Sequence, residues 1–191
     1  MYRFFKKFYK PLFCFCLCFF SVFVLIGCSG GQTNDTSSEK SSALHQEMAG
    51  GSEAPDFTAK LNNGETFTLS DRKGQVVLLN FWATWCSNCV KEMPAIEKLY
   101  EEYGNQVVII GVNVGEDKST VDAFIDTKNY TLPIAYDTES NISNLYPSAG
   151  IPYTVIIGKD GLVTETFLGA KDADSQYTKL RRALQEAYEA N

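Results

Sequence analysis

The pattern of apolar and polar positions over residues 53–191 predicts one α/β domain. Apolar runs rich in β-branched residues at 76–81, 107–114 and 153–157 are typical of strands buried on both faces. Asn62-Asn63-Gly64 predicts the tight turn of a hairpin. Strands are expected at 57–59, 67–69, 76–81, 107–114, 132–136, 153–157 and 162–168, and helical segments at 86–103, 120–128, 142–146 and 174–190.

The first 27 residues follow a different pattern, a short basic segment and then an apolar stretch from Leu12 to Ile26. This order and length predict a secretory signal peptide and not a membrane-spanning helix. The stretch ends in Leu25-Ile26-Gly27-Cys28, which resembles the lipobox of bacterial lipoproteins. We therefore expect removal of residues 1–27, lipidation of Cys28 and a location on the extracytoplasmic face of the membrane. The alternative is a signal anchor that is not cut.

Residues 28–52 are rich in small and polar side chains and contain almost no large apolar ones. Such a composition does not compensate for the entropy of ordering the backbone, so we expect a flexible tether. His45, the only histidine of the chain, lies in this tether and is expected to be a solvated bystander. The remainder, residues 53–191, is one domain of ordinary size and is large enough for a core of its own.

Charge excludes one class of partner. The whole chain has 17 basic and 23 acidic residues, a formal net charge of −6. Four of the basic residues belong to the predicted signal peptide, so residues 28–191 carry a formal charge of −10. A domain this acidic is not expected to bind nucleic acid.

Cysteine usage points to redox chemistry. Three of the six cysteines lie in the predicted signal peptide and a fourth is Cys28, which leaves only Cys86 and Cys89. The first of these falls where a buried strand gives way to a helix, and a helix N-terminus lowers the pKa of a thiol and so favours the reactive thiolate. One close pair of cysteines in an extracytoplasmic domain predicts a redox catalyst, whereas a disulfide-stapled scaffold would spread several pairs along the chain.

Glu92 stands one helical turn after Cys89, on the stripe of the helix that continues through Ile96 and Leu99. Burial there raises the pKa of a carboxyl group. Glu92 could then exchange a proton with Cys89. The alternative is a surface Glu92 that pairs with a neighbouring lysine.

Two further features flank the cysteines. Trp85 directly precedes Cys86 and is predicted to shape a docking surface. Pro152 follows Ile151 at the start of a buried strand, where proline cannot donate to the sheet. A cis Ile151-Pro152 bond would resolve this, but spacing alone leaves the isomer open.

Several segments together resemble the extracytoplasmic thioredoxin-like proteins of the TlpA/ResA type. The segments that carry this resemblance are Ala54-Pro55-Asp56-Phe57, Leu69-Ser70, the run from Val77 to Cys86, Glu92-Met93-Pro94, Gly150-Ile151-Pro152 and Lys159-Asp160-Gly161. The resemblance implies a thioredoxin fold, a central mixed sheet flanked by helices, with an N-terminal β-hairpin and an αβ insertion at about 115–148. It also implies a cis Pro152 facing the disulfide, Glu92 as the active-site glutamate, and Asn80 where cytoplasmic thioredoxins have a buried aspartate.

The same resemblance implies thiol-disulfide exchange. Cys86, exposed at the helix N-terminus, would attack a protein disulfide, Cys89 would resolve the mixed disulfide, and Glu92 would exchange the proton at Cys89. The backbone around Pro152 would pair with an extended client segment. No cofactor beyond the Cys86-Cys89 disulfide and no bound metal is expected. Implied partners are a membrane electron donor resembling CcdA/DsbD and clients such as a methionine sulfoxide reductase or apocytochrome c.

Three other functions are alternatives to a reductase of protein disulfides. Ser87 and Asn88 between the cysteines leave the direction of electron flow open, so an oxidase that forms disulfides in secreted proteins is the alternative within the class. A metal-delivery lipoprotein would need a second chain, because two thiolates are half of a structural zinc site. Peroxiredoxin-type catalysis is not indicated, because Thr84 stands two residues before Cys86 and that family places its threonine three before.

Overall fold

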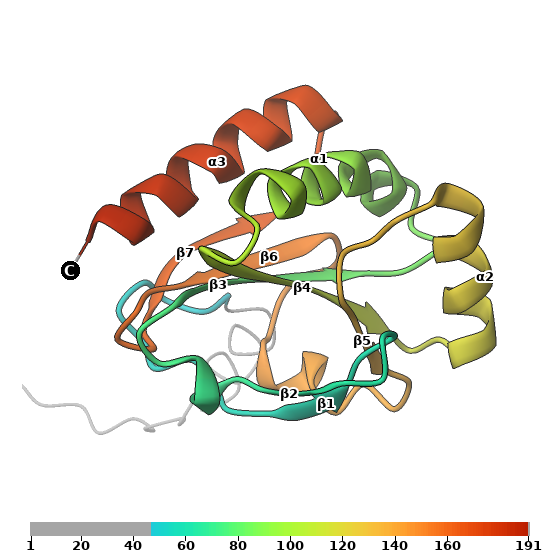
Figure 1. The fold of residues 1–191 in the computed structure, drawn as a ribbon, viewed down its shortest axis with the longest axis horizontal. Helices are drawn as coiled ribbons and strands as arrows, with labels where there is room; N and C mark the ends of the chain where they lie inside the picture. The colour runs from blue at the N-terminus through green and yellow to red at the C-terminus, as the bar shows by residue number, and fades with distance from the viewer. Residues whose placement is uncertain (1–46, 191) are drawn as a thin grey trace, which may run out of the picture. The chain divides into compact units, whose positions relative to one another are not determined.

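The computed structural model describes residues 47–190, so the predicted signal peptide, Cys28 and His45 lie outside the described residues (Figure 1). In chain order the elements are β1 (Thr58–Lys60), β2 (Thr66–Thr68), the 3₁₀ turn η2 (Ser70–Arg72), β3 (Val76–Trp82), α1 (Ser87–Tyr103), β4 (Val107–Val114), α2 (Lys118–Lys128), β5 (Ile134–Asp137), the 3₁₀ turn η3 (Ser143–Leu145), β6 (Tyr153–Ile157), β7 (Val163–Leu168) and α3 (Ala173–Glu189). The predicted elements are all present, and η2 is the one that the sequence did not predict.

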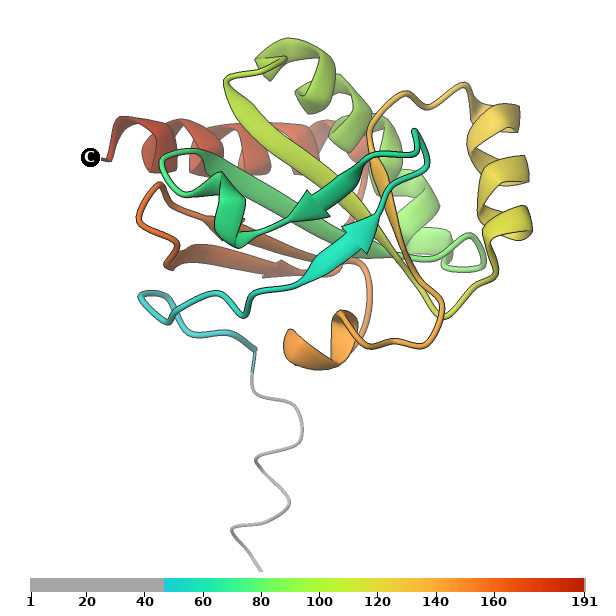
Figure 2. The same cartoon turned by 60° about the horizontal axis from the view of Figure 1, so that its bottom comes forward.

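A five-stranded mixed sheet in the order β5-β4-β3-β6-β7 forms the centre. The strands β3, β4 and β5 are parallel, while β6 and β7 run antiparallel to their neighbours. Helices α1 and α3 pack side by side on one face, and the β1-β2 hairpin with η3 covers the other (Figures 1 and 2). This arrangement confirms the predicted α/β fold with an N-terminal hairpin. The predicted insertion supplies α2, β5 and η3.

The central strand β3 is buried along its whole length, as its continuous apolar run predicts. Its side chains alternate between the two faces. Leu78 and Trp82 belong to the core cluster on the helix side of the sheet, where Trp82 packs against Phe124 of α2, whereas Leu79 and Phe81 belong to the cluster under the hairpin. Asn80 has the same parity as Leu78 and Trp82, so the pleat directs it toward the helices.

Both edges of the sheet are covered by backbone from the N-terminal part of the domain. The Gly51 N–H donates to the Val163 carbonyl at 2.7 Å, and the Val163 N–H donates to the Ser52 carbonyl at 2.8 Å. At the other edge, the Asn62 N–H donates to the Ile134 carbonyl at 2.9 Å, and the Ile134 N–H donates to Asn62 Oδ1 at 3.0 Å. These bonds occupy part of each edge and so reduce the template for pairing with another chain.

The end of the predicted tether differs from the expectation. Residues 49–52 are attached to β7 through the bonds above, and the Met48 N–H donates to the Tyr153 hydroxyl at 3.1 Å. Hydrogen bonding to a sheet edge fixes a segment that has too few apolar side chains to order itself. Among the described residues, none of the helices is long and apolar enough to cross a membrane.

Candidate active site

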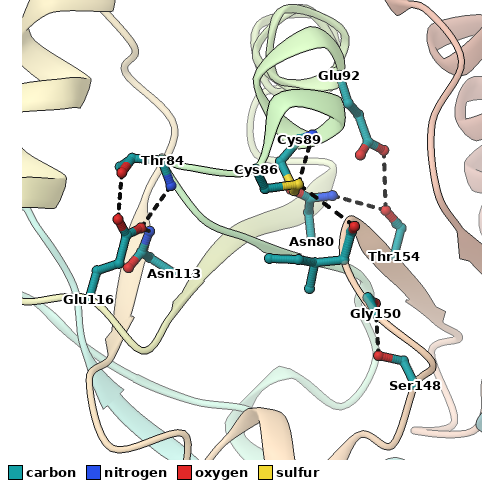
Figure 3. The surroundings of a disulfide bond; sticks show 11 residues. Asn80, Thr84, Cys86, Cys89, Glu92, Asn113, Glu116, Ser148, Gly150 and Thr154 are labelled. Carbon is teal, nitrogen blue, oxygen red and sulfur yellow. Dashed lines mark hydrogen bonds between the residues drawn. A yellow bond between two sulfur atoms is a disulfide. The ribbon is translucent and has the colours of Figure 1, made fainter. Parts of the chain in front are cut away.

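Cys86 lies at the N-cap position of α1, immediately before the first helical residue. Its Sγ accepts a hydrogen bond from the Cys89 backbone N–H at 3.1 Å (Figure 3). The first turn of α1 contains no acidic residue, so the positive end of the helix dipole acts on this sulfur without a competing carboxylate. In the reduced protein this position stabilises a Cys86 thiolate.

Cys86 and Cys89 form a disulfide with a Cα–Cα distance of 5.2 Å. Cys89 is fully buried, as the helical stripe predicts. Cys86 is only 8% exposed, which corrects the expectation of an exposed nucleophile; its sulfur is covered by the loop before β6. Trp85 next to it is 72% exposed, so this indole is the prominent group at the surface of the site.

The loop before β6 brings Ile151 and Pro152 to the cysteines, although they are distant in sequence. The Ile151-Pro152 peptide bond is cis, as the resemblance implies. The Ile151 carbonyl oxygen lies 3.7 Å from Cys86 Sγ, within reach of the thiol that the reduced form would carry. The Pro152 carbonyl accepts a hydrogen bond from the Gly169 N–H at 2.8 Å, which attaches this loop to the end of β7.

Glu92 is 1% exposed and points from α1 toward Thr154 of β6 (Figure 3). Its Oε1 accepts hydrogen bonds from Gln176 Nε2 at 2.8 Å and from Thr154 Oγ1 at 3.5 Å. Burial raises the pKa of Glu92 from 4.5 to about 7, and the hydrogen bonds partly oppose this rise. The alternative of a surface carboxylate paired with a lysine is therefore wrong, and Glu92 titrates near neutrality beside Cys89.

Asn80 extends this buried polar network toward β3. Its Nδ2 donates to Thr154 Oγ1 at 3.0 Å, and Thr154 in turn donates to Glu92. Asn80 Oδ1 and Glu92 Oε2 are buried and have no hydrogen-bond partner within residues 47–190. A buried acceptor without a donor is costly, and such groups are concentrated at sites of function.

Gln176 is a site residue that sequence reasoning missed. The sequence predicts a helix at 174–190 and assigns no site residue to it, but the structure buries Gln176 and leaves Tyr177 at the margin, where its hydroxyl donates to Glu102. The signal was present, because Gln176 stands one helical turn before the buried Leu180.

Glu116 is the second residue missed. Its carboxylate accepts hydrogen bonds from the Thr84 N–H at 2.7 Å, from the Thr84 hydroxyl and from Asn113 Nδ2 at 2.8 Å (Figure 3). The strands β3 and β4 are parallel neighbours, so their carboxyl ends lie at the same end of the sheet. For this reason a residue that follows β4 reaches the segment before Cys86. Glu116 therefore holds the start of the active-site segment, and the Thr84 hydroxyl is engaged by Glu116.

The structure brings Trp85, Cys86, Cys89, Glu92, Ile151 and Pro152 together at the N-terminus of α1, while Cys28 lies outside the described residues. A dithiol at a helix N-terminus, with a buried acid one turn away, can exchange disulfides with another molecule. Within residues 47–190, no group of three or more His, Cys, Asp and Glu side chains is placed to hold a metal ion. Fold and site define a thioredoxin-like thiol-disulfide oxidoreductase.

Comparison with known proteins gives the family. The family model described as AhpC/TSA family matches residues 51–166. Thioredoxin-like protein YneN of Bacillus subtilis (strain 168) is 36% identical over 160 residues, which cover 82% of this chain and 91% of that protein. Thiol-disulfide oxidoreductase ResA of Geobacillus kaustophilus is 42% identical over 123 residues, 64% of this chain and 71% of that protein. The chain therefore belongs to the AhpC/TSA family, as a thiol-disulfide oxidoreductase of the TlpA/ResA type.

Solved structures confirm the thioredoxin fold. One of them is the exposed lipoprotein thioredoxin of Streptococcus pneumoniae strain TIGR4, which superposes with a TM-score of 0.59 at 27% sequence identity. The match covers 67% of this chain and 99% of that one.

Proposed function

We propose that this chain is a lipid-anchored, extracytoplasmic reductase of protein disulfides. The observation that carries the proposal is the Cys86-Cys89 pair at the N-cap of α1, beside the buried acid Glu92 and the cis Ile151-Pro152 loop. The anchoring rests on the lipobox-like segment ending in Cys28, and one similar protein bears the name exposed lipoprotein.

The reaction starts from the reduced protein. The Cys86 thiolate attacks one sulfur of a client disulfide, that S–S bond breaks, and the other client sulfur leaves as a thiolate. Glu92 takes the proton of Cys89, whose thiolate then attacks Cys86 Sγ in the mixed disulfide. The second client thiolate leaves, so the client has gained two electrons and the Cys86-Cys89 dithiol has lost two and become a disulfide. Two protons, one from Glu92 and one from solvent, complete the client dithiol.

We infer the direction of electron flow from the groups around the two sulfurs. In the reduced protein Cys89 is a buried thiol beside Glu92, so no Cys89 thiolate stabilises the reduced state relative to the disulfide. Neither Ser87 nor Asn88 supplies the positive charge that would stabilise a thiolate. The N-cap position of Cys86 stabilises its thiolate and opposes these two effects, but no charged side chain in the first turn of α1 adds to it, so we expect a reducing couple.

Clients and electron donor are part of the proposal. We expect a methionine sulfoxide reductase or apocytochrome c as the client, and a membrane carrier resembling CcdA/DsbD as the donor. Both rest on the resemblance to the TlpA/ResA type. A deletion strain distinguishes the clients, because loss of repair of oxidised methionine supports the first and loss of cytochrome c supports the second. If the deletion strain shows neither defect, both client proposals are refuted.

The chemistry is tested by trapping. Cys89→Ser should accumulate a mixed disulfide with client protein that a reductant releases, whereas Cys86→Ser should form none and lose exchange activity. Equal trapping by both variants would contradict the assignment of Cys86 as the attacking thiol. Consumption of peroxide at a rate matching disulfide exchange would favour a peroxidase instead, and we expect none because the Thr84 hydroxyl is bound to Glu116.

A further inference from the structure

Gln176 is one of the buried polar residues that the reaction above does not use. It lies in the first turns of α3, is 4% exposed, and directs its side-chain amide to Glu92, 84 residues away in sequence. Burying an amide on an apolar helix face is unfavourable unless it is hydrogen-bonded. Packing alone would favour an apolar residue here, one turn before Leu180.

The hydrogen bonds on Glu92 are asymmetric. Oε1 receives both Gln176 Nε2 at 2.8 Å and the Thr154 hydroxyl at 3.5 Å, and Thr154 is held in turn by Asn80 at 3.0 Å. Oε2 has no partner within residues 47–190. The donors therefore stabilise the carboxylate through one oxygen and leave the other to be protonated.

We propose that Gln176 is a positioning residue, which holds Glu92 Oε1 from α3 so that Oε2 is the atom that takes the proton of Cys89. This inference rests on the proposed role of Glu92 as proton acceptor. It goes beyond that role because it assigns the orientation and ionisation of Glu92 to a residue outside the cysteine motif.

The groups that face Glu92 come from every element packed against it. The strands β3 and β6 contribute the neutral Asn80 and Thr154, α3 contributes Gln176 and the positive charge of Lys179, and α1 carries the two cysteines. Burial raises the pKa of Glu92, and the Gln176 hydrogen bond is the largest effect that lowers it. Removing that bond should therefore move the pKa of Glu92 further up.

The test is a titration of Glu92 itself in the oxidised protein. Carbon-13 NMR follows its carboxyl signal, which is identified by its loss in Glu92→Gln. Gln176→Met keeps the length of the side chain but has no donor, and we expect the midpoint to rise by about one pH unit. At about pH 7 the ionised fraction of Glu92 would then fall about five-fold. Gln185→Met, an exposed change on the same helix, is the matched control and should leave the midpoint in place.

The catalytic consequence is read from the pH dependence of mixed-disulfide resolution. Gln176→Met should move its transition upward with Glu92, and should have no further effect in a Glu92→Gln background. An unchanged Glu92 midpoint in Gln176→Met would overturn the proposal whatever the rates show. A shifted midpoint without any transition in the rate would leave Gln176 as the residue that holds Glu92 and refute Glu92 as the proton acceptor. Should Gln176→Met fail to fold, Gln176→Leu serves the same titration.

Discussion

Replacing Glu92 by glutamine should change how the stability of the folded, oxidised protein depends on pH. Glutamine keeps the shape of the side chain and an acceptor for Gln176 Nε2, but it cannot ionise. The substitution therefore removes the cost of a buried charge and disturbs the packing of α1 little.

The magnitude follows from the pKa of Glu92, which burial raises from 4.5 to about 7. The pKa of Glu92 is higher in the folded protein than in the unfolded protein, so the folded protein binds this proton more tightly. Protonated Glu92 therefore favours folding at low pH, and this contribution is lost as pH rises from 4.5 to about 7. At about 1.4 kcal/mol per pH unit, the complete loss is about 3.5 kcal/mol. Between about pH 5 and about pH 8, linkage gives a loss of about 2.5 kcal/mol.

Urea unfolding at these two pH values measures the effect. The wild-type protein should lose about 2.5 kcal/mol more stability than Glu92→Gln between about pH 5 and about pH 8. Glu101→Gln removes an exposed carboxylate from the same helix and should behave like the wild type. A pH dependence of Glu92→Gln that matches the wild type within about 0.5 kcal/mol would refute the assignment of a near-neutral pKa to Glu92.

Two further predictions concern residues beside the cysteines. Glu116→Ala should lower the free energy of unfolding by about 1.5 to 3 kcal/mol, because it leaves the Thr84 N–H and the buried Asn113 amide without their acceptor. Urea unfolding measures this change, with the exposed substitution Glu139→Ala as the control. A loss of unfolding free energy no larger than that of the control would show that other contacts hold the segment that begins at Thr84. Trp85→Ala should change stability by less than about 0.5 kcal/mol, since the indole is exposed, yet slow exchange with a protein client more than with a small disulfide. Equal slowing of both reactions in stopped-flow measurements would argue against a docking role.

The elements were predictable because each depends on a local pattern. The continuous run of β3 and the Asn62-Asn63-Gly64 turn fix their own conformations, and the spacing of Cys89, Ile96 and Leu99 gives the buried face of α1. Cys86 and Cys89 are identified from the sequence for the same reason, since the strand, the turn and the helix around them are contiguous.

The missed residues depend on tertiary contacts. Gln176 meets Glu92 only because α1 and α3 pack side by side, and a rotation of α3 by one residue would have buried Tyr177 instead. Glu116 reaches Thr84 because β3 and β4 are parallel neighbours, which the order of strands in the sequence does not state.

The central claim is that the Cys86-Cys89 couple serves as a reductase, and its equilibrium reduction potential tests this most directly. The measurement equilibrates the mature protein with defined thiol buffers. We predict a value near that of thioredoxin, about −270 mV, because Cys89 is a buried thiol and neither Ser87 nor Asn88 supplies a positive charge that would stabilise the reduced state. A value near that of the strongly oxidising members of the fold, about −120 mV, would contradict the account and assign the protein to disulfide formation.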